Sequence, residues 1–190
     1  LLQDDGSVDG RVDTLVEEMA QGHAERIFPA IAELLATGGL AYADLDRLAV
    51  PTGPGSFTGL RIGFAAARGL ALALGIPAVG VPSLQAISLR GAPHQPVIVQ
   101  LDARRGEAWF QHFLAPGQPI DNPVVLPREE ALRRVPSPMT PIETPYPDIA
   151  ALARYAARLT PAHFPPEPQY VREADAKPQE GARIARVAAP

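Results

Sequence analysis

The chain has 190 residues, of which 46% are hydrophobic and 20% charged, and its formal net charge at pH 7 is −4. This length and composition exclude a disordered tail and a disulfide miniprotein, and they predict one or two globular domains with a hydrophobic core. The small negative charge argues against binding nucleic acid through bulk charge. The absence of cysteine excludes disulfides, thiolate catalysis and cysteine metal sites, and it fits a reducing compartment.

The beginning of the chain has the pattern of short strands followed by a helix. Residues 1–6 look like the end of a strand entering a hairpin turn, so we expect further residues to precede them. Loose alternation over residues 8–12 and 14–19 predicts short antiparallel strands. Apolar residues then recur every three or four positions over residues 23–35, which predicts a helix, with Pro29 inside it.

A glycine-rich loop joins a predicted strand at residues 45–50 to a predicted helix at residues 60–74. Backbone N–H groups that lead into a helix N-terminus can hold an anion such as phosphate. The loop lacks both the Walker lysine and the dinucleotide glycine pattern, so a simple tight turn is the favoured alternative. The candidate phosphate-loop residues are Gly53, Gly55, Ser56, Thr58 and Arg61.

The predicted helix at 60–74 carries a face of small residues, with Gly59 and Gly63 four positions apart. Such a face lets a second backbone approach closely, either the protein's own sheet or a helix of a partner. Glycine in mid-helix costs about 1 kcal/mol relative to alanine, so we expect compensating contacts there. The apolar run at 62–75, at about 14 residues, is too short to cross a bilayer, and we expect no membrane span.

The remaining elements predict two lobes with a joint near residues 91–96. We place a first lobe at residues 1–93 and a second, smaller and proline-rich lobe at residues 94–190. The other predicted elements are strands at 78–81, 97–101, 107–114 and 169–172, and helices at 82–89, 128–134 and 149–159.

Sequence patterns for catalysis and metal binding are missing. The four histidines show no i, i+4 pair, and no serine lies in a G-x-S-x-G context. Asp102 and Glu107 form either a carboxylate pair, such as a magnesium site, or a surface ion-pair cluster with Arg104 and Arg105. The ion-pair cluster is favoured, and we expect no catalytic residue and no metal ligand.

Several motifs, in order along the chain, resemble those of one family. Residues 52–63 read TGPGSFTGLRIG and residues 80–84 read GVPSL. Both resemble motifs of the bacterial TsaB (YeaZ) family of tRNA threonylcarbamoyladenosine biosynthesis proteins. Further motifs similar to the family's lie at residues 22–25, 102–107, 170–172 and 175–177.

The resemblance implies an α/β protein with the actin-like ATPase (ASKHA) superfold, in which two RNase H-like lobes have mixed sheets flanked by helices. It also implies an accessory subunit that has no cofactor of its own. A TsaD-type subunit and a TsaE-type ATPase would be its partners and would carry the ATP and the metal. The complex would modify the adenosine beside the anticodon of tRNA, which this chain would reach only indirectly. The resemblance further implies a cytoplasmic location and a homodimer when the subunit is alone.

The resemblance places the partner contacts on the two helices of the first lobe. Two departures stand out: the family's first strand is absent ahead of Leu1, and residues 135–147 are shorter and richer in proline. The alternative function is an active ASKHA-type ATPase or phosphotransferase that uses the glycine loop, whereas the missing histidine pair excludes an M22-type peptidase. The predicted interface residues are His23, Ile27, Phe28, Ile31, Leu35, Gly59, Leu60, Gly63, Ala66, Ala67 and Leu70.

Overall fold

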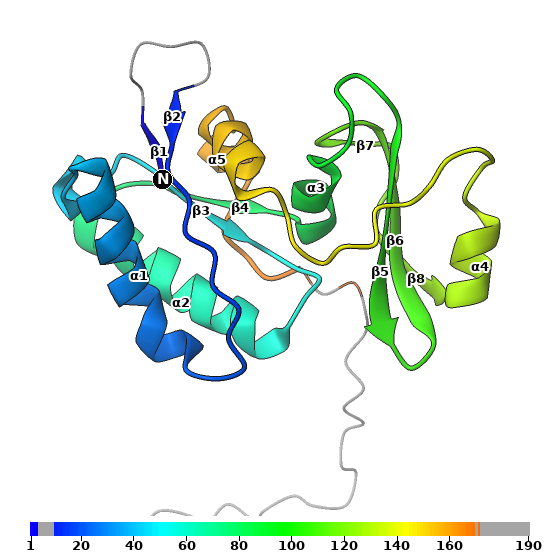
Figure 1. Ribbon diagram of the computed structural model, residues 1–190, viewed down its shortest axis with the longest axis horizontal. Coiled ribbons are helices and arrows are strands. Elements are labelled where there is room, and N and C mark those ends of the chain that lie inside the picture. Colours follow the sequence, from blue (N-terminus) through cyan, green and yellow to red (C-terminus); the bar gives the residue numbers. More distant parts are fainter. Residues whose placement is uncertain (4–9, 170, 172–190) are drawn as a thin grey trace, which may run out of the picture.

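A computed structural model describes residues 1–3, 10–169 and 171 of the chain (Figure 1). Its helices are α1 (His23–Gly38), α2 (Phe57–Leu74), α3 (Ser83–Ser88), α4 (Arg128–Arg133) and α5 (Ile149–Ala157), with 3₁₀ turns at Tyr42–Asp44 and Pro161–His163. Its strands are β1 (Leu2–Gln3), β2 (Arg11–Val12), β3 (Leu48–Pro51), β4 (Ala78–Val81), β5 (Val97–Arg104), β6 (Glu107–Ala115), β7 (Gln118–Pro119) and β8 (Val124–Pro127).

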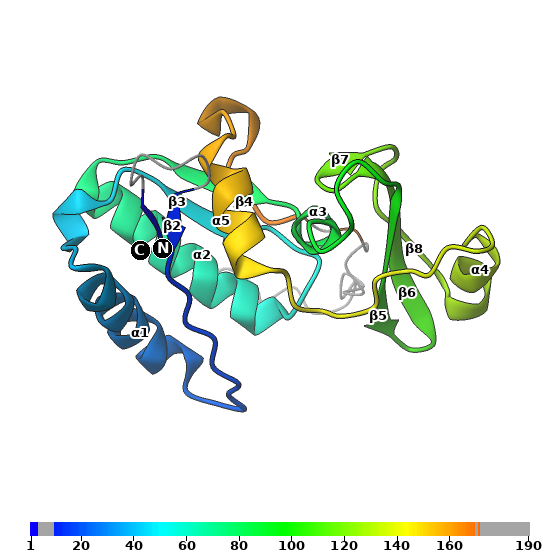
Figure 2. The same ribbon diagram turned by 45° about the horizontal axis from the view of Figure 1, so that its top comes forward.

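A parallel strand pair, β3 and β4, joined by α2, organises the first part of the chain. α1 and α2 lie on one side of this pair and α5 lies on the other (Figures 1 and 2). On the α5 side, Val79 and Val81 are fully buried and pack with Leu152 and Ala156. β1 and β2 form a separate antiparallel pair, so the first part of the chain has two small sheets.

The β5–β6 hairpin lies at the centre of a third sheet, the β5–β8 sheet, in which β7 and β8 both pair with β6. Because successive residues of a strand point to opposite faces, the hairpin has two apolar faces. One face packs on α3, with Val99 and Phe113 fully buried. The other face packs on α4 through Phe110 and Ala131.

Glycine and serine set the ends of the two long helices. α1 begins after Gly22 and ends before Gly39, and both glycines have left-handed backbones, at φ 82° and 69°. Ser56 caps α2, because its Oγ accepts the N–H of Gly59 at 3.3 Å. α2 therefore begins at Phe57 rather than at the predicted residue 60.

After α5 the chain returns to the first strand pair. The N–H of Gly80 donates to the carbonyl of Phe164 at 2.8 Å, and the N–H of Gln169 donates to the carbonyl of Thr52 at 2.8 Å. Residues 149–169, which the predicted division assigns to the second lobe, thus contact the first. The boundary at 93/94 stays a prediction.

The predicted strand at 14–19 is wrong, because residues 13–22 form no helix or strand. Their alternation has no neighbouring strand to pair with, and Glu17 instead forms an ion pair with Arg26 of α1. In the predicted strand at 8–12, residues 8 and 9 lie outside the described residues. The same holds for residues 170 and 172 of the predicted strand at 169–172.

Candidate functional site

The predicted partner surface lies on α1 and α2, which run next to one another (Figures 1 and 2). Its residues differ widely in exposure. His23, Phe28 and Gly59 are exposed, Ile27, Ile31, Leu60, Gly63, Ala67 and Leu70 are half-buried, and Leu35 and Ala66 are buried. The buried members, Leu35 and Ala66, pack inside the subunit. That the predicted interface residues bind a partner stays a prediction.

The glycines of α2 face different surroundings. A Cβ at Gly63 would lie 3.5 Å from Cγ2 of Val50, so Gly63 lies against β3. A Cβ at Gly69 would meet nothing within 4 Å, and one at Gly59 would meet only the capping Ser56. Gly63 therefore faces β3 inside the subunit, where a Cβ would make an ordinary contact, whereas the other two glycines leave the outer side of α2 open.

The two helices also expose large apolar side chains, two of which the sequence pattern did not single out. Phe57 is 56% and Leu72 87% exposed, and Phe28 on α1 is 45% exposed. These three side chains are the large apolar groups that α1 and α2 expose to solvent. Within the described residues, α2 is also the one helix with the length and composition to span a membrane, a test that core helices pass as well.

An exposed ion-pair cluster holds the segment before α1 against that helix. The guanidinium of Arg26 donates to the carboxylate of Glu17 at 2.5–2.7 Å and to that of Glu33 at 2.6–2.9 Å. These hydrogen bonds lower the pKa of both carboxyl groups from 4.5 and raise the pKa of the guanidinium. The cluster borders the surface of α1.

The glycine loop is hydrogen-bonded within the subunit. The N–H of Gly53 donates to Ser83 Oγ at 3.1 Å, and the N–H of Gly59 donates to Ser56 Oγ. Pro54 has no N–H. Two donors that an anion would need are thus already used, which supports the tight-turn alternative. Among the candidate phosphate-loop residues, Gly53 is buried, and Gly55, Ser56, Thr58 and Arg61 are exposed.

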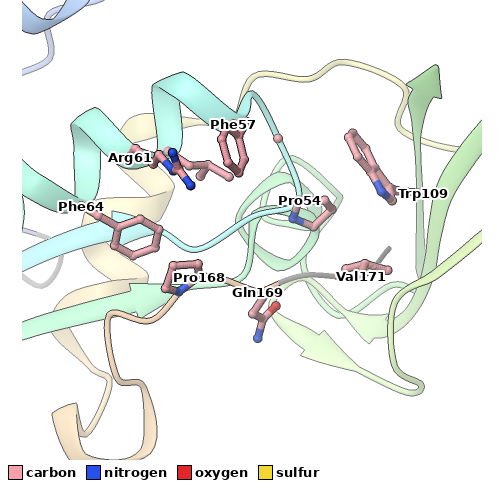
Figure 3. A pocket seen from close by; sticks show the side chains of 10 residues that line it. Pro54, Phe57, Arg61, Phe64, Trp109, Pro168, Gln169 and Val171 are labelled. Carbon is pink, nitrogen blue, oxygen red and sulfur yellow. The ribbon is translucent and has the colours of Figure 1, made fainter. Parts of the chain in front are cut away.

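A pocket of about 130 Å³ lies beside this loop, at the N-terminal end of α2 (Figure 3). The Arg61 guanidinium lies 3.8 Å from the centre of the Phe57 ring at this pocket, a cation–π contact. The walls come from the loop and α2, from β6, and from residues 168, 169 and 171. Their apolar members are Pro54, Phe57, Leu60, Phe64, Trp109, Pro168 and Val171, and their polar side chains are Arg61 and Gln169.

Polar clusters elsewhere have structural roles. Asp102 Oδ1 accepts the N–H of Arg104 at 2.8 Å, so this carboxylate stabilises the β5–β6 turn. On β6, His112 Nδ1 lies 2.6 Å from Asp121 Oδ2. In the part of the chain that the structure describes, no three His, Asp or Glu residues are grouped to hold a metal ion.

Known proteins resemble this chain in sequence over part of their length. The family model "TsaD: tRNA N6-adenosine threonylcarbamoyltransferase" matches residues 16–124. The Escherichia coli (strain K12) tRNA threonylcarbamoyladenosine biosynthesis protein TsaB is 38% identical over 110 residues, 55% of this chain and 47% of that protein. The uncharacterized protein ML0378 of Mycobacterium leprae is 35% identical over 179 residues, 87% of this chain and 49% of that protein. The chain spans about half the length of these relatives.

Solved structures resemble the fold. A Pseudomonas aeruginosa protein with similarity to peptidase YEAZ superposes with a TM-score of 0.70 and 26% sequence identity, over 86% of this chain and 91% of that chain. This likeness confirms the predicted actin-like ATPase (ASKHA) fold. The family model covers more than half of the chain, and relatives from three bacteria carry the TsaB name. The chain therefore belongs to the TsaD family and, within it, to the TsaB (YeaZ) group.

Proposed function

We propose that this protein is a non-catalytic subunit for tRNA threonylcarbamoyladenosine modification, and that it binds and activates a TsaD-type transferase subunit. The observation that carries the proposal is the outer surface of α1 and α2, which exposes Phe28, Phe57 and Leu72. The pathway is taken from the E. coli relative, whose name assigns it to the biosynthesis of this modified nucleoside.

The physical basis of the proposal is the apolar area that these helices leave uncovered. Burying apolar surface stabilises a complex by about 25 cal/mol per Å². Aromatic side chains at the centre of an interface contribute a large part of the binding energy. α1 and α2, with lengths of about 24 and 27 Å, are in contact with one another, so a partner could bind along both helices.

The proposal extends to the other components of the complex. A TsaE-type ATPase joins the two subunits, ATP and metal are bound by the partner subunits, and tRNA is reached through the complex. In isolation the chain forms a homodimer through the same surface. These events take place in the cytoplasm.

Calorimetry with the purified TsaD-type subunit of the same organism tests the surface. Replacing Leu72 by glutamate puts a charge on the outer side of α2, and we expect the dissociation constant to rise at least about tenfold. Leu132→Glu on α4 is the matched control, because Leu132 is also exposed, at 49%, and lies away from both helices. An equal loss of affinity in the two variants would contradict the proposal that the partner binds this surface.

A cellular measurement tests the pathway. Cells that lack this chain should lose threonylcarbamoyladenosine from their tRNA, and the wild-type gene should restore it. Leu72→Glu should restore less of the modified nucleoside than Leu132→Glu does. Full modification in the deleted cells would show that this protein is not needed for the reaction.

A further inference from the structure

We propose that the pocket at the N-terminal end of α2 receives one apolar side chain of the partner protein, and that a neighbouring carboxylate of the partner pairs with Arg61. This inference rests on the proposed function, because it deepens the same docking surface. The pocket continues that surface, since Phe57 both lines it and is exposed on the outer side of α2.

The size of the pocket fits a single side chain. An engineered cavity of about 150 Å³ lined by apolar side chains holds a benzene ring. At about 130 Å³ this pocket has room for one ring or one branched aliphatic group. Phe57, Phe64 and Trp109 lie around it (Figure 3), so an apolar occupant would meet aromatic surface on several sides.

The walls do not suit a phosphate-bearing ligand. Pro54 in the wall has no N–H to offer a phosphate, and the N–H groups of Gly53 and Gly59 in the adjoining loop are used by Ser83 and Ser56. The lining is otherwise almost wholly apolar, which favours a hydrocarbon group.

The charge of Arg61, unpaired among the described residues, indicates which group of the partner lies beside the apolar side chain in the pocket. Arg61 is stacked on Phe57 and, among the described residues, forms no ion pair and no hydrogen bond. The indole N–H of Trp109 likewise has no acceptor within the described chain. An occupant that fills the pocket would remove water from both donors, so it must bring an acceptor with it. A carboxylate beside the apolar anchor meets this requirement, and opposite charge at the rim also selects the partner.

Trp109 provides a direct readout, because it is the single tryptophan of the chain. Full-length chain labelled with 5-fluorotryptophan should give one ¹⁹F resonance from this wall of the pocket. Addition of the unlabelled TsaD-type subunit should shift that resonance as the complex forms. Phe57→Ala, which removes the exposed wall, should reduce both the shift and the affinity.

Charge reversal at two positions of α2 separates the pocket from the rest of the surface. Arg61→Glu should raise the dissociation constant about tenfold or more. Arg68→Glu makes the same charge change two turns further along the exposed side of α2 and should have a several-fold smaller effect. Circular dichroism and thermal melting of each variant establish that it folds.

The outcomes distinguish the two proposals. If the complex forms while the Trp109 resonance stays in place and both arginine variants bind alike, the pocket is not an anchor site, although the docking surface stands. If no complex forms, both proposals fail. If MgATP alone moves the resonance, the occupant is a nucleotide and the inference is overturned.

Discussion

Gly80 of β4 lies where residues 164–166, the segment after α5, pack against the first strand pair. A Cβ at this position would lie 2.5 Å from the carbonyl oxygen of Pro165 and from Cγ2 of Thr52. The N–H of Gly80 also donates to the carbonyl of Phe164. Glycine is required here by the close approach of a neighbouring backbone.

Gly80→Ala should lower the free energy of unfolding by about 1–3 kcal/mol, because the new methyl group forces the backbone of residues 164–166 away from β4. Urea denaturation measures the change. Gly69→Ala is the matched control, because its Cβ meets nothing within 4 Å. In an exposed helix interior, alanine stabilises the helix relative to glycine by up to about 1 kcal/mol. Destabilisation of both variants would contradict the stated cause.

At the scale of elements, α5 depends on a side chain far from it in sequence. Nη1 of Arg47 lies 2.7–3.1 Å from the carbonyl oxygens of Ala156, Ala157 and Leu159, at the end of the helix. The carbonyl of Ala156 also accepts the N–H of Leu159 at 3.2 Å, and a cation suits the negative end of the helix dipole. Arg47 therefore ties α5 to the start of β3.

Arg47→Met keeps much of the apolar stem and removes the donors. We expect the free energy of unfolding to fall by about 1.5–3 kcal/mol, the usual contribution of hydrogen bonds that involve a charged group. Hydrogen exchange should show faster opening of α5 than of α4. Arg68→Met, at an exposed position with no ion pair or hydrogen bond among the described residues, should change stability little.

The cluster of Arg26, Glu17 and Glu33 predicts an acid-dependent attachment of residues 13–22 to α1. The pKa of both carboxyl groups is lowered in the folded protein by hydrogen bonds from Arg26. Their stabilisation is therefore fully present above the unfolded pKa of 4.5 and is lost as the pH falls through the folded pKa.

The double variant Glu17→Gln/Glu33→Gln tests this prediction. It should melt below the wild type at neutral pH, and the difference should shrink as the carboxyl groups of the wild type become protonated. Thermal melting over a pH series measures both proteins. A difference that is constant with pH would show that the carboxylate charge plays no part.

At the scale of the whole molecule, a buried polar network connects α3, α5 and the β6–β7 turn. Gln85 Nε2 donates to the carbonyl of Gly117 at 2.8 Å and to the hydroxyl of Tyr155 at 2.6 Å. The Tyr155 hydroxyl donates to the same carbonyl at 3.0 Å, and the N–H of Gly117 donates to Ser88 Oγ. Hydrogen bonds around one turn thus connect the sheet of β5 to β8 with α5, which packs on the β3–β4 pair.

Tyr155 should make this connection sensitive to alkali. Burial raises the pKa of its phenol above 10.0, an effect partly offset by the hydrogen bond with Gln85. The stability linked to the neutral phenol is therefore present below pH 10 and falls as the pH rises toward the folded pKa.

Tyr155→Phe should lower the free energy of unfolding by about 1 kcal/mol near neutral pH. The difference from the wild type should narrow above pH 10, since phenylalanine has no proton to release. Denaturation at several pH values measures this, with the exposed Tyr146→Phe as control. A difference in the free energy of unfolding that grows with pH would contradict the prediction.

Elements with local signals could be predicted from the sequence, and contacts between distant residues could not. The strand predicted at 78–81 coincides with β4, and the hairpin predicted at 97–101 and 107–114 matches β5 and β6 closely. The alternation at 14–19 predicted a strand wrongly, because an alternating pattern does not show whether a neighbouring strand is present to pair with it.

The candidate site was predicted only in part, for the same reason. The spacing of apolar residues identified α1 and α2 but not which side of each helix the strands would cover. The pocket brings Phe57 and Trp109 together from elements far apart in sequence, and no local pattern encodes that meeting. The Arg47 contact with α5 is likewise non-local.

The late position of α5 in the chain has a consequence for biosynthesis. β4 leaves the ribosome well before the helix that covers Val79 and Val81 has been made. During that interval the nascent chain carries an apolar strand face without its cover, a target for chaperones and for misassembly. Ribosome-bound fragments that stop before residue 149 should therefore be captured by trigger-type chaperones more strongly than fragments that extend past residue 169.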